Sequence, residues 1–236
     1  MTSDTVWHRA PYAPDGERMR DTRETLQQLW LKHAKGIGIE RPTMPLLSQL
    51  VGAWGAPHRH YHSLRHLQEC LQLLERWGRD MIARHEIGIA LWFHDAVYDP
   101  RRDDNEDRSA RWAVTVLRDL GVPEDIRRRV GKLIRATRYL SPIANAQADR
   151  FDGLDLMLDI DLAILGADRA RFEEYERQVR LEHPHVPDEA FARARADFVE
   201  ALLGRSPLFR TELARAELEA RARDNLQRSL RTWRRA

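Results

Sequence analysis

Hydrophobic residues along this chain recur every three to four positions, which is the spacing of the buried face of an α-helix. Alternating hydrophobic and polar runs, typical of β-strands, are nearly absent, and Ala, Leu, Arg and Glu dominate the sequence. Glycine and proline separate the periodic segments, as at Gly121 with Pro123. The pattern predicts helices at about residues 19–35, 43–54, 62–78, 84–98, 106–120, 124–139, 153–165, 168–182, 188–203 and 211–234. We therefore expect an all-α fold, a bundle of about ten helices.

The remaining features of the chain predict one domain and limit its partners. No repeat, low-complexity tract or Gly/Ser linker divides the 236 residues, so we expect a single domain over 1–236. With 39 basic and 37 acidic residues, the net charge of +2 argues against a nucleic-acid partner. The single cysteine cannot form an internal disulfide, and no segment approaches the roughly 18 apolar residues needed to span a membrane. The N-terminus has no apolar signal segment, so we expect a cytoplasmic protein without a membrane partner. The sequence does not indicate the oligomeric state.

A nearly unbroken hydrophobic segment, IGIALWFHDAVYDP, contains a histidine and an aspartate, His94 and Asp95. Hydrophobic residues surround this pair on every side of the expected helix, as in a helix buried in a core. An isolated carboxylate there would be costly, so we expect it to be protonated, paired or bound to a cation. Histidine and aspartate are suitable ligands for Zn, Mn, Fe or Co, and a divalent ion would remove that cost.

Two other segments carry ligand-type residues on hydrophobic stripes. In YHSLRHLQECLQLL, His62 and His66 are four residues apart, so we expect both on one helix face and at least one toward the core. In LDLMLDIDLAILG, Asp161 is in register with leucines and Asp159 is not, so we expect only Asp161 to point inward. Each residue alone is more often a hydrogen-bonded core residue than a ligand. Three separate helices each carry an inward ligand-type residue, and this combination favours a metal site.

The blocks RHYHSLRHL, ALWFHDAVYDP, DNEDRSA and DIDLAILG together resemble a bacterial family of predicted metal-dependent phosphohydrolases in the HD-domain superfamily, across about residues 26–230. The resemblance implies one helical HD-type domain and one divalent metal ion as cofactor. The candidate metals are Mn, Fe, Co, Zn, Ni and Mg. It places the metal ligands at His66, His94, Asp95 and Asp161. His62 matches a histidine that acts as general acid in the related cyclic-nucleotide phosphodiesterases.

The implied activity is hydrolysis of a small phosphorylated molecule, with nucleotides as the favoured class. The metal would activate a water for attack on phosphorus, and His62 would protonate the leaving oxygen. Arg59 and Arg65 would offer counter-charges to substrate phosphates, and Glu106 would orient a ligand or the water. Exposed arginines in an arginine-rich chain, and an acid in the first turn of a helix, explain these last three residues equally well.

Two alternatives stay open at this point. A non-catalytic helical protein could keep a metal or nucleotide site without turnover. An oxygen-activating di-iron enzyme would need further ligands that the sequence does not clearly offer. We expect a single ion, although Asp95 could bridge a second one.

Overall fold

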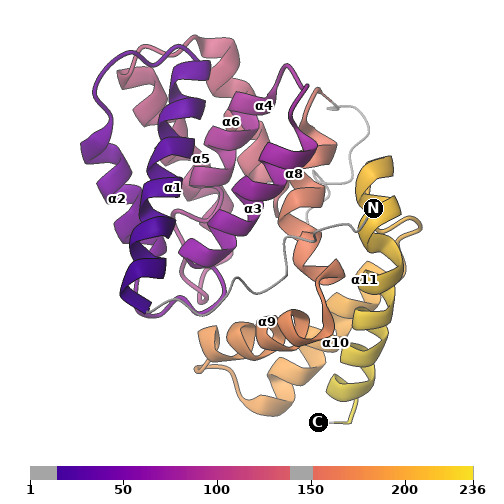
Figure 1. The fold of residues 1–236 in the computed structure, drawn as a ribbon. Helices are drawn as coiled ribbons and strands as arrows, with labels where there is room; N and C mark the ends of the chain where they lie inside the picture. The colour runs from indigo at the N-terminus through magenta and orange to yellow at the C-terminus, as the bar shows by residue number, and fades with distance from the viewer. Residues whose placement is uncertain (1–14, 139–150, 236) are drawn as a thin grey trace. The chain divides into compact units, whose positions relative to one another are not determined.

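The structure is a computed structural model, which describes residues 15–138 and 151–235 (Figure 1). Within these ranges the chain forms ten α-helices, one short 3-10 helix and no strand, which confirms the all-α prediction. The elements are α1 (Asp15–Gly36), α2 (Met44–Trp54), α3 (Leu64–Trp77), α4 (Arg84–Phe93), α5 (Asn105–Asp119), α6 (Glu124–Ala136), α8 (Leu154–Asp161), η2 (Leu162–Gly166), α9 (Arg169–Glu182), α10 (Asp188–Leu203) and α11 (Glu212–Trp233). None of the described helices is long and apolar enough to cross a membrane.

The chain divides into two compact units, Met1–Met157 and Leu158–Ala236. The division falls inside α8, which continues through it without a break. The single-domain expectation therefore stays a prediction. Outside the described residues lie positions 1–14, 139–150 and 236. They include the last position of the helix expected over 124–139.

In the first unit, α4 is the central helix, since it contacts α1, α3, α5 and α6 (Figure 1). All its residues from Ile87 to Phe93 are buried, as expected for a helix that is hydrophobic on every side. Trp92 meets Trp30 edge to face at 5.5 Å, and its carbonyl accepts a hydrogen bond of 2.9 Å from the indole of Trp54. The tryptophans thus join α1, α2 and α4 in one core.

Helices α1 and α4 approach closely through two histidine–glycine pairs. A Cβ on Gly88 would lie 2.3 Å from the ring of His33, and a Cβ on Gly36 would lie 2.2 Å from the ring of His85. Each ring therefore occupies the space that a larger residue on the other helix would need. Because the pairs run in opposite order along the two helices, α1 and α4 are antiparallel here.

In the second unit, α11 packs along η2 and α10 (Figure 1). Asn225 of α11 donates to the carbonyls of Leu165 and Ala167, at 2.8 and 3.0 Å. A Cβ on Gly166 would lie 2.6 Å from the Cβ of Leu218, so this contact requires glycine. The α-helix predicted over 153–165 ends at Asp161, and a 3-10 helix follows it. The prediction is therefore wrong beyond Asp161.

One predicted helix end near His94 is also wrong, because the helix predicted over about 84–98 ends at Phe93. The helix predicted at about 62–78 is present, and it begins at Leu64 after an extended Ser63. The amide of His94 still donates to the Ala90 carbonyl at 2.8 Å, and that of Ala96 closes a turn on Phe93 at 3.0 Å. Beyond this turn, the backbone bonds to side chains. The amide of Val97, for example, donates to Ser109 Oγ at 3.0 Å. The histidine–aspartate pair therefore lies at the C-terminal end of a buried helix and not in its middle.

Candidate metal centre

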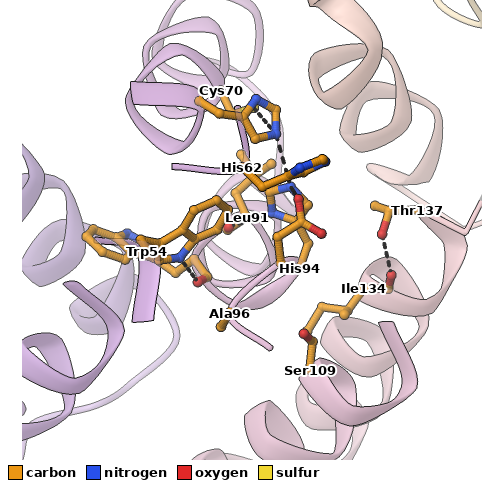
Figure 2. Close-up of polar contacts among 12 residues, drawn as sticks. Trp54, His62, Cys70, Leu91, His94, Ala96, Ser109, Ile134 and Thr137 are labelled. Atoms are coloured by element: carbon orange, nitrogen blue, oxygen red, sulfur yellow. Dashed lines mark hydrogen bonds and ion pairs between the residues drawn. The ribbon is translucent and has the colours of Figure 1, made fainter. Parts of the chain in front are cut away.

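The imidazole of His94 is wholly buried and held in one orientation (Figure 2). Its Nδ1 lies 2.8 Å from the carbonyl oxygen of Leu91. A carbonyl can only accept, so Nδ1 must carry the proton and donate it. Leu91 lies in the last turn of α4, where carbonyls lack a helical partner, so the end of this helix provides the acceptor. In the neutral imidazole, the Nε2 lone pair is then available to a metal ion.

Two further ligand-type atoms face His94 Nε2. His66 Nε2 lies 3.3 Å away, and Asp95 Oδ2 lies 3.2 Å away. A carboxylate oxygen and an imidazole lone pair repel each other unless a proton or a cation lies between them. A proton on His66 would satisfy one of these contacts, whereas a metal ion could satisfy both. Two imidazole nitrogens about 2.0–2.1 Å from one ion in tetrahedral geometry are about 3.3–3.4 Å apart. The observed separation of 3.3 Å fits this arrangement.

Aromatic side chains enclose the two imidazoles. The ring of Trp54 lies 5.3 Å from that of His94 and 6.2 Å from that of His66. Tyr61 lies 4.7 Å from the ring of His66, which is 3% exposed. Because such a wall excludes water and lowers the local dielectric, interactions with charge at this point are strengthened.

Asp161, the last residue of α8, belongs to the same group of potential ligands. His66, His94 and Asp161 each offer one ligand atom, and these atoms all lie within 4.8 Å of one another. The two histidines are buried and the aspartate is half-buried. Such a group of two imidazoles and one carboxylate could hold a divalent metal ion. Asp95 does not belong to this group. Its carboxylate lies beside the group, because it contacts His94.

The candidate acid His62 does not lie on the helix that carries His66, because α3 begins two residues later. The prediction that both share one helix face is therefore wrong. The ring of His62 stacks instead on Tyr98, with 4.2 Å between centroids, and lies 6.1 Å from the ring of His66. His62 is thus held near the two histidines by an aromatic stack.

The other predicted site residues have diverse surroundings. Arg59 is buried and donates to backbone carbonyls, whereas Arg65 is exposed and pairs with Glu69 at 3.2 Å. Glu106 is half-buried in the first turn of α5. The metal-ligand group of the described residues does not include Glu106.

Asp159 corrects the prediction that only Asp161 of its segment points inward. It is 1% exposed, and its carboxylate accepts from the amides of Arg210 and Thr211 at 2.8 and 2.7 Å. The hydroxyl of Thr211 also donates to it at 2.7 Å. Asp159 therefore fixes the chain at the start of α11, a role that requires no metal.

Sequence analysis missed three parts of the site. These are the Leu91 carbonyl, the stack of Tyr98 on His62, and Cys70, whose Sγ lies 3.6 Å from His66 Nδ1. Only Cys70 carried a signal in the sequence, because it is one helical turn beyond His66 on the same hydrophobic stripe.

A scan against family models and searches of curated proteins and solved structures gave no match to this chain.

Proposed function

We propose that this chain is a metal-dependent phosphohydrolase of the HD type, which acts on a small phosphorylated molecule, with nucleotides as the first class to test. The observation that carries the proposal is the surroundings of His94 Nε2, where an imidazole nitrogen and a carboxylate oxygen converge. The order of ligand residues along the chain supports the HD type. It is a histidine, a His-Asp pair 28 residues later, and a distant aspartate.

The residues of the chain would divide the work as follows. His66, His94 and Asp161, with Asp95 beside them, would hold the ion. A bound divalent ion polarises a phosphoryl oxygen and lowers the pKa of a coordinated water. The Leu91 carbonyl keeps the proton of His94 on Nδ1, and the aromatic wall limits the access of water. His62, whose ring lies 6.1 Å from that of His66, would donate a proton to the leaving oxygen as general acid.

The first test is the metal content of the purified protein after incubation with Co²⁺ or Mn²⁺ and removal of excess metal. We expect about one ion per chain in the wild type, and a loss in His94→Gln and Asp161→Asn variants that circular dichroism shows to be folded. His185→Ala is the matched control, because His185 is exposed and lies outside the ligand group. Equal metal content in all four proteins, or none in the wild type, contradicts the proposal.

The second part of the test separates an enzyme from a binding protein. The loaded wild type is assayed for phosphate release from a panel of nucleotides and phosphate esters, beside His62→Gln. We expect His62→Gln to keep its metal and to lose about 10²–10⁴-fold in turnover, the usual contribution of a general acid. Nucleotide binding without release would support the non-catalytic alternative.

A further inference from the structure

Arg59, which lies before α3, donates to three backbone carbonyls. Its Nη1 lies 2.6 Å from the carbonyl of Asp95 and 3.2 Å from that of His62. Its Nη2 lies 3.0 Å from the carbonyl of Ala96. The guanidinium thus connects the segment that carries the candidate acid to the segment that carries the Asp95 carboxylate.

The guanidinium is also held by aromatic rings. It lies 5.5 Å from the ring of Trp54 and 5.3 Å from the ring of Tyr98. Trp54 is itself fixed by its bond to the Trp92 carbonyl, and Tyr98 is the ring on which His62 stacks. Arg59 is 8% exposed, so its position is set by the core and not by solvent.

The chain has a physical reason to place an arginine here. Carbonyls at and just beyond the end of α4 lack helical partners, and cationic donors bond well to them. A guanidinium has five donors in a rigid plane and can reach three carbonyls at once. A lysine ammonium keeps the charge but has a compact head that does not match this arrangement.

We infer that Arg59 is a positioning residue of the candidate metal centre, which sets the places of the Asp95 carboxylate and of His62 through their backbone carbonyls. This inference rests on the proposed function. It replaces the expected role of Arg59 as a phosphate ligand, because both terminal nitrogens of its guanidinium, Nη1 and Nη2, already donate to backbone carbonyls.

The test compares Arg59→Lys with Arg76→Lys, a matched control on an exposed arginine in the last turn of α3. Co²⁺ affinity is measured by titration at a temperature where circular dichroism shows every variant to be folded. The visible spectrum of the bound Co²⁺ is recorded, because it reports ligand geometry. We expect Arg59→Lys to bind Co²⁺ about tenfold or more weakly and with an altered spectrum, the usual cost of losing a group that orients a ligand. Arg76→Lys should match the wild type in both affinity and spectrum.

Three outcomes would overturn the inference, and they differ in what else they affect. A wild type that binds no Co²⁺ contradicts the proposed function and the inference together. Wild-type affinity and spectrum in Arg59→Lys, with a raised KM for phosphate release, contradict the inference alone and restore the phosphate-binding role. Lower stability of Arg59→Lys with unchanged Co²⁺ affinity shows a purely structural role. If Arg59→Lys does not fold, Arg59→Gln provides the same comparison, since its planar amide keeps two donors.

Discussion

His94 and His33 are both wholly buried imidazoles in the first unit, yet their surroundings differ. His94 donates through Nδ1, and ligand-type atoms face its Nε2 at 3.2 and 3.3 Å. Neither ring nitrogen of His33 makes a hydrogen bond to the described residues, and its nearest carboxylate oxygen, in Glu75, is 3.5 Å away. Burial alone therefore does not identify a ligand. Convergence of several ligand-type atoms on one nitrogen is what makes His94 a candidate ligand.

His33 leads to a prediction on pH. Burial lowers the pKa of His33 from 6.5 to about 4. The carboxylate of Glu75 opposes this shift, whereas His85, Lys32 and Arg84 reinforce it. Between pH 6.5 and about 4 the unfolded chain therefore takes up a proton that the folded chain does not, so stability falls as the pH is lowered through this window. We expect His33 to account for a loss of about 2 kcal/mol in the free energy of unfolding between pH 7 and pH 5.

The measurement is urea unfolding of the wild type and His33→Leu at several pH values across this range. Other groups titrate in both proteins, so the difference between the two curves isolates His33. The difference in the free energy of unfolding between the two proteins should change by about 2 kcal/mol from pH 7 to pH 5, with His33→Leu losing less stability than the wild type. Parallel curves would show that His33 is not held neutral by burial.

At the scale of elements, the sequence predicts which helices exist better than where they end. The continuous hydrophobic segment of α4 is plain in the sequence, and the helix begins where it was expected. Its end is determined by the side chains of Arg59 and Ser109, which come from elsewhere in the chain and take the backbone groups of residues 95–97. Local periodicity contains no information on such partners.

The packing of α4 on α1 gives a second prediction. Gly88→Ala would place a Cβ 2.3 Å from the His33 ring, against atoms at the base of that ring that cannot move away easily. We expect a loss of about 1–3 kcal/mol in the free energy of unfolding, as for other overpacked cores. Gly52→Ala in α2 is the matched control, because a Cβ there would meet nothing within 4 Å. It should be neutral or stabilise the protein by up to about 1 kcal/mol, the difference in helix propensity.

Chemical denaturation of both variants checks this pair, with Gly88→Ala/His33→Ala as a third protein. Removal of the ring should recover part of the loss caused by Gly88→Ala, because the clash then has no partner. If Gly88→Ala is as stable as Gly52→Ala, the close approach of the two helices is not as the structure has it.

At the scale of the whole molecule, the sequence identifies the residue types of the site but not the way they are assembled. The spacing of His66, His94 and Asp161 suggests a common site, and the structure brings their ligand atoms within 4.8 Å of one another. The sequence could not separate Asp159 from Asp161 reliably, since both lie in one short hydrophobic segment. The two aspartates differ in their hydrogen-bond partners, because the amides of Arg210 and Thr211 donate to the carboxylate of Asp159. Such long-range partners follow from the fold and not from helical periodicity.

A metal site of this kind should affect the stability of the folded chain as a whole. An ion that binds the folded chain and not the unfolded chain stabilises it by about 2.7 kcal/mol at a free concentration of 100 times its Kd. For a chain of 236 residues, each 1 kcal/mol raises the unfolding midpoint by roughly 2–4 °C. We therefore expect Co²⁺ or Mn²⁺ to raise the midpoint by roughly 5–10 °C, and a chelator to reverse the shift.

Thermal unfolding with and without metal, followed by circular dichroism, measures this effect. Asp161→Asn and His94→Gln should unfold at midpoints that metal does not change, whereas His185→Ala should respond as the wild type does. The response of the variants decides the interpretation. A metal-induced shift of equal size in His94→Gln would place the stabilising ion elsewhere in the molecule, because a centre that depends on Nε2 of His94 cannot bind as well without it.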